Sequence, residues 1–212
     1  LRARAGLYTE TCQLVVRADS NIQTLDDLSG HTVSIGAEES GTERNATQIL
    51  EFAGMPSSLV ATKNLDYIEA TKELKAGDID AFFCTAGLTT TVIDELSKEC
   101  DIRLIPLTDT VISKMLESSS AHTSEVIPAG TYTGQTTDIS TIGVKSVLIT
   151  KANVSDDTIE QLTSLLFEKE NELSYSNSLK LELTYDFATD GIPIPFHDGA
   201  KRYYEDCGYS TN

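Results

Sequence analysis

The sequence is poor in basic residues and contains no tryptophan. Lysine and arginine together number 16 against 33 aspartates and glutamates, which gives the 212 residues a formal net charge of −17. A strongly negative chain is repelled by nucleic acid and by anionic membrane surfaces, so we expect neither as a partner. The acidic residues are scattered rather than gathered in blocks, which is typical of a solvated surface.

Long apolar runs are also lacking. No stretch of the sequence approaches the ~20 apolar residues that are needed to span a bilayer. Residues 1–8 do not contain the uninterrupted apolar core of a secretion signal. The start of the sequence therefore leaves the cellular location open.

Cysteines are few and widely spaced. The four of them, Cys12, Cys84, Cys100 and Cys207, stand too far apart for a CxxC redox pair or a compact zinc site. Isolated thiols are the favoured interpretation. In an oxidising compartment a Cys12–Cys207 or a Cys84–Cys100 bridge is conceivable, but spacing alone does not give the Cα separation that a disulfide needs.

Catalytic motifs are missing as well. The sequence has no G-x-S-x-G elbow, no H-E-x-x-H pair and no P-loop lysine. Its three histidines, His31, His122 and His197, are separated and have no nucleophile pattern nearby. We therefore predict that the protein is not an enzyme and that it uses no cofactor and no metal.

What the sequence does contain is an alternation of strands and helices. Apolar residues recur at helical spacing after each strand, for example at Ala46, Ile49 and Ala53, where Gly54 supplies the stop. Residues 118–141 form a long turn-rich stretch. The predicted strands cover residues 13–17, 32–35, 79–83, 102–105 and 144–149. This pattern predicts an α/β fold with mainly parallel sheets flanked by helices on both faces.

The loop after the strand at 32–35 is the first candidate binding site, because ligands of open α/β sheets lie beyond the carboxyl ends of the strands. Ser40, Gly41 and Thr42 lead into a helix and present unpaired backbone N–H groups and two hydroxyls at the positive end of the helix dipole. This arrangement suits a carboxylate or a phosphate. Asn45, in the first turn, could reach the same ligand. The alternative is that Ser40 and Thr42 only cap the helix.

Two further segments complete the candidate site. Thr85 and Gly87 follow the strand at 79–83 and would place a hydroxyl and a bare backbone opposite the first loop. An ordinary strand-to-helix turn is the alternative there. Tyr132 offers an aromatic ring on the long loop 128–134, and long loops in compact domains tend to be functional.

The order of several short motifs resembles the TAXI group of solute receptors, which serve tripartite ATP-independent periplasmic (TRAP) transporters. The motifs are Leu14-Val15-Val16-Arg17, Leu25-Asp26-Asp27-Leu28-Ser29-Gly30, Val33-Ser34-Ile35-Gly36, Ser40-Gly41-Thr42, Gly77-Asp78-Ile79-Asp80-Ala81-Phe82-Phe83, Ile127-Pro128-Ala129-Gly130-Thr131-Tyr132 and His197-Asp198-Gly199-Ala200. No single motif is decisive, but they keep the family order over nearly the whole chain.

The resemblance implies a type 2 periplasmic-binding-protein-like fold, in which two α/β lobes joined by crossing strands close on a small solute. Residues 1–19 would be a remnant of lobe one with the first crossover strand. Residues 20–142 would be lobe two, and 143–212 the return crossover strand and the C-terminal part of lobe one. The ligand-binding residues carried over by position are Ser40, Gly41, Thr42, Asn45, Thr85, Gly87 and Tyr132.

The same resemblance implies a biological setting. The chain would bind a small organic solute, a carboxylate or an amino-acid-like molecule, and deliver it to the membrane subunit of a TRAP transporter. It would act as a monomer outside the cytoplasm, either free in the periplasm or lipid-anchored at the outer face of the cell membrane. Two other readings stay open: a transferase or dehydratase on the same two-lobed fold, and a ligand-sensing domain of a signalling protein.

Two features depart from the family pattern. No glycine- and tyrosine-rich segment occurs before Leu1, so we expect on the order of a hundred residues of lobe one to be missing. Glu38 and Glu39 stand just before the helix start, where small residues are more usual, and their charges oppose a bare anion. A zwitterion or an amine-bearing ligand would suit this pair better.

Overall fold

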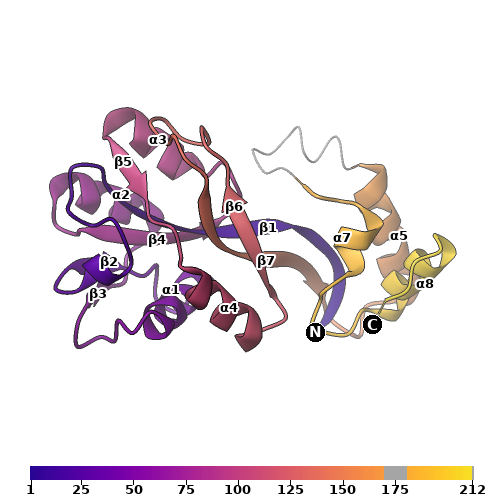
Figure 1. The fold of residues 1–212 in the computed structure, drawn as a ribbon. Coiled ribbons are helices and arrows are strands. Elements are labelled where there is room, and N and C mark those ends of the chain that lie inside the picture. Colours follow the sequence, from indigo (N-terminus) through magenta and orange to yellow (C-terminus); the bar gives the residue numbers. More distant parts are fainter. Residues whose placement is uncertain (170–180, 212) are drawn as a thin grey trace. The chain divides into compact units, whose positions relative to one another are not determined.

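The computed structural model describes residues 1–169 and 181–211 as a mixed α/β chain (Figure 1). Its strands are β1 (Arg2–Arg17), β2 (Thr32–Ser34), β3 (Ala61–Lys63), β4 (Ala81–Ala86), β5 (Ile102–Leu104), β6 (His122–Ile127) and β7 (Ile139–Thr150). Its helices are the 3-10 helix η1 (Asp26–Leu28) and the α-helices α1 (Gly41–Phe52), α2 (Tyr67–Ala76), α3 (Thr91–Glu99), α4 (Asp109–Ser118), α5 (Asp156–Glu168), α7 (Tyr185–Thr189) and α8 (Asp198–Asp206). Within the described ranges, no helix has both the length and the apolar character that crossing a membrane requires.

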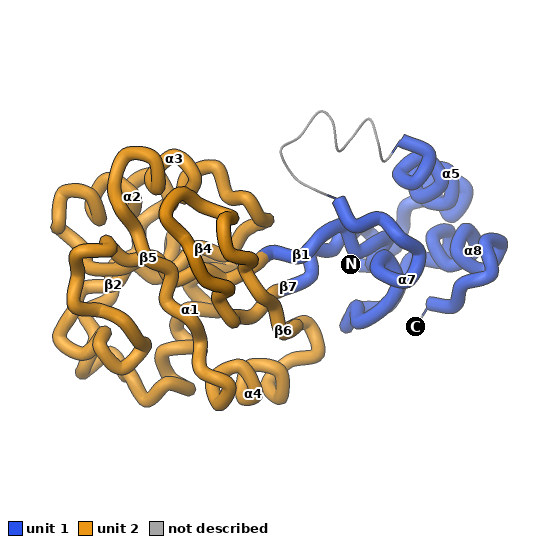
Figure 2. The backbone as a smooth tube through the Cα atoms, turned by 45° about the horizontal axis from the view of Figure 1, so that its top comes forward, with its two compact units in different colours: residues 1–10, 144–212 blue, residues 11–143 orange. Residues whose placement is uncertain are grey.

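The chain divides into two compact units (Figure 2). Unit 1 consists of Leu1–Glu10 and Val144–Asn212, and unit 2 is the continuous stretch Thr11–Gly143. The long strands β1 and β7 each contribute residues to both units. That unit 2 is the second lobe of a receptor stays a prediction.

The strands form one sheet that confirms the predicted α/β class. In the described part of the chain the sheet has seven strands in the order β3-β2-β4-β1-β7-β6, with β5 paired to β1. The strands predicted at 32–35, 79–83 and 102–105 all lie in it, as expected. Strand β2 runs parallel to β3 and β4, whereas β1 runs antiparallel to β4 and β5. The sheet is therefore mixed in direction where β1 enters it.

Two strands were not expected from the sequence. The three residues of β3 are all exposed, and in β6 only Ile127 is buried. Neither segment shows the apolar alternation by which a half-buried strand is recognised. As a result β6 occupies part of the stretch 118–141 that the sequence presents only as turns.

Helices cover both faces of the sheet in unit 2, as predicted. On one face Ala46, Ile49 and Leu50 of α1 and Val111, Ile112 and Met115 of α4 form a core with Leu14, Val16, Val33 and Phe83. On the other face Ala70 and Leu74 of α2 and Ile93 and Leu96 of α3 pack with Val15, Phe82 and Cys84. The alternation along β1 and β4 explains this division, because successive side chains of a strand point to opposite faces.

Unit 1 has a separate core rich in aromatic rings. Ala3 and Ala5 of β1 pack with Ile159, Phe196 and Tyr204, and all five are almost fully buried. Around them the rings of Phe167 and Tyr185 stack with centroids 4.7 Å apart. Helices α5 and α8 approach closely at Gly199, where an added β-carbon would collide with the carbonyl oxygen of Asp156. Glycine is the residue that permits such an approach.

None of the four cysteines is joined to another in a disulfide. Cys12 and Cys84 are buried in unit 2, in the adjacent strands β1 and β4, and their side chains belong to the cores on opposite faces of the sheet. The bridges that an oxidising compartment would allow are therefore not formed.

Candidate functional site

The loop between β2 and α1 shapes the helix start that the sequence singled out. Ser40 is the N-cap of α1, and its hydroxyl oxygen accepts a hydrogen bond from the backbone N–H of Glu43 at 3.1 Å. The Glu43 carboxylate accepts in turn from the backbone N–H of Glu39 at 2.6 Å and from Nδ2 of Asn64 at 2.8 Å. These bonds fix the loop to the first turn of the helix.

The first two amides of α1 stay available. Among the described residues no acceptor pairs with the backbone N–H groups of Gly41 and Thr42. Both lie at the positive end of the helix dipole, where an oxyanion is favoured. The two N–H groups can therefore donate to an oxygen of a ligand.

The hydroxyl of Thr42 has a different role from the one its position suggests. Thr42 is only 4 % exposed, and its Oγ1 lies 2.6 Å from Oη of Tyr67. Oη of Tyr67 donates to the carbonyl of Thr85 at 2.9 Å, and the N–H of Thr85 approaches Oγ1 of Thr42 at 3.4 Å and Oη of Tyr67 at 3.3 Å. These contacts, which we call the Tyr67 clamp, join the starts of α1 and α2 to the end of β4.

The groups of the clamp are neutral. Burial, followed by the nearby Cys84, raises the pKa of Tyr67 to about 12. Burial also raises the pKa of the Cys12 thiol to about 12, although its contact with the Thr85 hydroxyl opposes that rise. Both side chains therefore keep their protons at neutral pH, and the positive potential that favours an anion here comes from the helix dipole.

Thr85 supplies a buried hydroxyl beside the helix start. The residue is 7 % exposed, and its Oγ1 has no hydrogen-bond partner of good geometry. Thr85 is opposite Cys12 in the pairing of β4 with β1, and like Phe83 it faces the side of the sheet that α1 covers. A thiol is a weak hydrogen-bonding group, so the hydroxyl keeps the capacity to bind a stronger partner.

Gly87 and Tyr132 belong to a second, fully bonded network. Oη of Tyr132, which is 2 % exposed, donates to Oε1 of Gln13 at 2.6 Å and accepts from the N–H of Thr90 at 3.1 Å. The Thr90 hydroxyl accepts from Nε2 of Gln13 at 2.8 Å and donates to the carbonyl of Gly87 at 2.9 Å. The hydroxyl of Tyr132 is therefore engaged inside the protein, where it fastens the turn after β4 to β1.

The structure thus brings together only part of the predicted set. Ser40, Gly41, Thr42 and Thr85 meet at one place, whereas Asn45 is buried along α1 and is 7 % exposed. Gly87 and Tyr132 are linked to each other through Thr90. Tyr67 was not predicted as part of the site, because its contact with Thr42 joins residues 25 apart in different helices.

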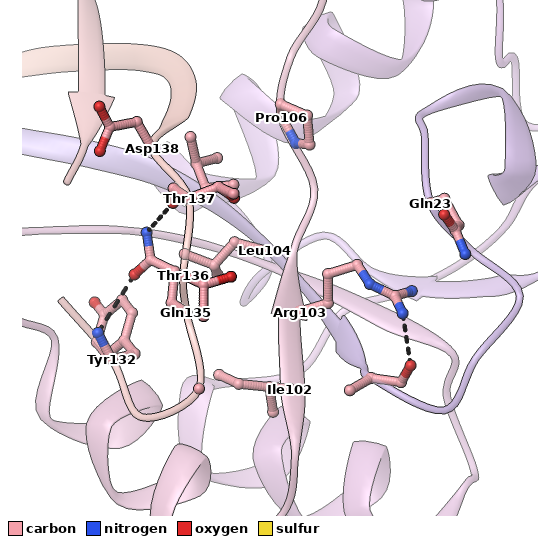
Figure 3. A pocket seen from close by; sticks show the side chains of 13 residues that line it. Gln23, Ile102, Arg103, Leu104, Pro106, Tyr132, Gln135, Thr136, Thr137 and Asp138 are labelled. Atoms are coloured by element: carbon pink, nitrogen blue, oxygen red, sulfur yellow. Dashed lines mark hydrogen bonds between the residues drawn. The ribbon is translucent and has the colours of Figure 1, made fainter. Parts of the chain in front are cut away.

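Unit 2 also contains a cavity of about 400 Å³ beside β5, shown in Figure 3. Two of the polar side chains that line it, those of Arg103 and Gln135, are already bonded. The Arg103 guanidinium donates to the carbonyls of Ala18 and Ile22 at 2.6 and 2.9 Å, and Nε2 of Gln135 donates to the carbonyl of Thr137 at 3.1 Å. These bonds leave fewer donors of Arg103 and Gln135 for fixing a ligand.

Comparison with solved structures finds weak overall likenesses to solute-binding proteins. The periplasmic aliphatic sulphonate binding protein SsuA from Escherichia coli is 14 % identical over 84 % of this chain and 53 % of its own, with a TM-score of 0.45. Tv2483 bound to L-arginine is 16 % identical over 84 % and 58 %, with a TM-score of 0.46. Holo ArgBP from T. maritima is 18 % identical over 78 % and 57 %, with a TM-score of 0.40. The chain thus spans between 53 % and 58 % of the length of these three proteins.

Unit 2 is an α/β unit with free backbone donors in a loop between a strand and a helix. In α/β folds with open sheets, small ligands lie at loops of this kind. Family comparison is more specific. The model of the NMT1-like family matches residues 1–208, so this chain belongs to the NMT1-like family.

Proposed function

We propose that the chain is the ligand-binding part of an extracytoplasmic solute receptor of the TAXI type, which hands a small organic solute to the membrane subunit of a TRAP transporter. In this proposal unit 2 is the second lobe of the receptor, and binding involves no bond making or breaking. The proposal rests on one observation above all: the amides of Gly41 and Thr42 at the start of α1 are unpaired, and Thr42 contacts Thr85, a residue whose buried hydroxyl is unsatisfied. We call these three groups the anion seat.

The chemistry of the anion seat favours a carboxylate. Two N–H donors and one hydroxyl can satisfy the oxygens of a single carboxylate group. Glu38 and Glu39 add negative charge at the entrance, and both are exposed. Since like charges at close range repel, a solute that also carries an amine is favoured over a multiply charged anion. An amino-acid-like solute meets both conditions.

The positions of the histidines support binding rather than catalysis. Each histidine has its Nδ1 in contact with a neighbouring group that holds the local structure. The contacts are His31 with Oδ2 of Asp80 at 3.2 Å, His122 with the carbonyl of Met115 at 2.9 Å, and His197 with the N–H of Gly199 at 3.2 Å. In none of these contacts is the partner a serine, threonine or cysteine side chain that the histidine could activate as a nucleophile.

Replacement of Gly41 by proline tests the proposal. Gly41 is the first residue of α1, where proline fits a helix, and a β-carbon there would meet nothing within 4 Å. Ser40 has φ −78° and ψ 161°, which a following proline also accepts. Gly41→Pro therefore removes one N–H donor of the anion seat and leaves the helix intact.

Native mass spectrometry of the protein as purified, followed by calorimetric titration with the solute so identified, provides the measurement. We expect Gly41→Pro to weaken binding by about 1.5–3 kcal/mol, the range for a hydrogen bond to a charged group. Gly41→Ala keeps the N–H and is the matched control. Equal affinity in both variants, with a solute bound, would place the binding site away from α1.

A further inference from the structure

We infer that Tyr67 is a positioning residue of the anion seat: its hydroxyl sets the spacing between the amides of α1 and the hydroxyl of Thr85 before a ligand binds. The inference rests on the proposed function, because it concerns the same site. Tyr67 itself would not touch the ligand, and nothing in its sequence surroundings marks it.

The first step of the argument is the direction of the hydrogen bonds. Oη of Tyr67 donates its proton to the carbonyl of Thr85, at 2.9 Å. The hydroxyl of Thr42 must then be the donor in its 2.6 Å contact with Oη of Tyr67. Oγ1 of Thr42 in turn faces the N–H of Thr85 at 3.4 Å. Every proton of the clamp therefore points to an atom of the protein, and none is left for a ligand.

The second step concerns what the clamp connects. Thr42 carries one of the two free amides of the anion seat, and Thr85 carries its hydroxyl. A single oxygen, Oη of Tyr67, contacts both residues. Movement of α1 along the sheet would therefore stretch at least one short hydrogen bond within a buried site, where broken bonds are costly.

The third step concerns the freedom that remains without the clamp. Gly36 packs against the helix start, because a β-carbon added to it would stand 2.8 Å from Cβ of Thr42. That contact blocks approach of the loop toward Thr42 but does not prevent separation. Core packing with Phe83 holds the body of α1 on the sheet, and the clamp supplies the hydrogen bonds that join Thr42 to Thr85. Preorganisation of the anion seat therefore depends on Tyr67.

Tyr67→Phe is the direct test, and Tyr203→Phe is its matched control. Tyr203 is also a packed tyrosine whose hydroxyl contacts Oη of Tyr185 at 3.2 Å and the Cys207 thiol, and it lies in unit 1. Sodium acetate serves as the simplest carboxylate probe, and its binding is followed through the amide NMR signals of Gly41 and Thr42. We expect about tenfold weaker acetate binding in Tyr67→Phe and no change in Tyr203→Phe.

Thr42→Val and the Tyr67→Phe/Thr42→Val double variant show whether the two hydroxyls act together. If the clamp works as a unit, the double variant binds acetate no more weakly than either single variant, and Thr42→Ser restores wild-type binding. Additive losses, or acetate binding in Tyr67→Phe as tight as in the wild type despite lowered thermal stability, would overturn the positioning role.

A second readout needs no ligand. Hydrogen exchange at the amide of Thr85 should accelerate in Tyr67→Phe while amides of unit 1 keep their wild-type rates. Unchanged exchange at Thr85 would overturn the inference. If acetate perturbs neither Gly41 nor Thr42 in the wild type, the proposed carboxylate site fails, and the exchange rates still decide whether Tyr67 holds α1 to β4.

Discussion

Gly36 lies directly against the side chain of Thr42: a β-carbon added to Gly36 would stand 2.8 Å from both Cβ and Cγ2 of Thr42. Gly36 also has φ +100°, a conformation that other residues rarely adopt. Two separate requirements, space and backbone conformation, thus call for glycine at the start of the loop that leads to the anion seat.

Gly36→Ala should therefore destabilise the protein by about 2–3 kcal/mol, since overpacking adds to backbone strain. Gly130→Ala is the control, because Gly130 has φ +81° and open space around it. There we expect only the strain, about 1 kcal/mol. Urea unfolding measures both values, and equal losses would contradict the close contact with Thr42.

Tyr132→Phe should cost about 1–3 kcal/mol of unfolding free energy, because it leaves the Gln13 oxygen and the Thr90 amide without their buried partner. Tyr8→Phe removes a hydroxyl that bonds Glu10 at 3.2 Å in a partly exposed place, so we expect a loss of about 0.5 kcal/mol or less. Thermal or urea unfolding of the two variants gives the comparison. A smaller loss for Tyr132→Phe than for Tyr8→Phe would contradict the network.

Ionisation of Tyr67 should lower stability at alkaline pH. Its pKa is raised from 10.0 to about 12 in the folded protein, so between these values the unfolded chain releases its proton first. The stabilising contribution is complete below pH 10 and is lost as the pH rises toward 12. Unfolding free energy measured over this window should fall less steeply in Tyr67→Phe than in the wild type. Identical slopes would show that the hydroxyl is not held in its neutral form by folding.

The cysteines should react in two classes. Cys12 and Cys84 are 2 % and 0 % exposed, whereas Cys100 and Cys207 are half-buried. In addition, the pKa of Cys12 is raised to about 12, and the thiolate is the reactive form. A thiol reagent such as DTNB should label Cys100 and Cys207 in the native protein, and the other two only on unfolding. Rapid labelling of all four would contradict the burial of β1 and β4.

Local patterns in the sequence were sufficient for much of the fold. Ser40 is a strong N-cap followed by apolar residues at helical spacing, so the start of α1 could be placed correctly. The strand at 79–83 was recognisable from its apolar run. In contrast, β3 consists of three exposed residues and gives no apolar signal. A strand that joins a sheet through backbone hydrogen bonds alone, without burying apolar side chains, cannot be recognised from a single sequence.

The candidate site could be predicted only where it depends on neighbours in sequence. Ser40, Gly41 and Thr42 form one turn, so their common location followed from the pattern. The partners of their side chains did not follow, because Tyr67 reaches Thr42 from another helix and Tyr132 reaches Gln13 across 119 positions. The hydroxyls of Tyr67 and Tyr132 are both hydrogen-bonded inside the protein, and a local sequence pattern does not predict such long-range contacts.

The division of the chain has a consequence for the order of folding. The two segments of unit 1 are separated in sequence by the whole of unit 2, and closing so long a loop in an unfolded chain carries an entropic penalty. Folded unit 2 removes that penalty, because the Thr141 hydroxyl donates to the carbonyl of Cys12 at 2.6 Å and so holds the neighbouring ends of the two segments together. During synthesis, unit 2 also emerges from the ribosome before residues 144–212 do. Unit 2 is therefore expected to fold before unit 1 does.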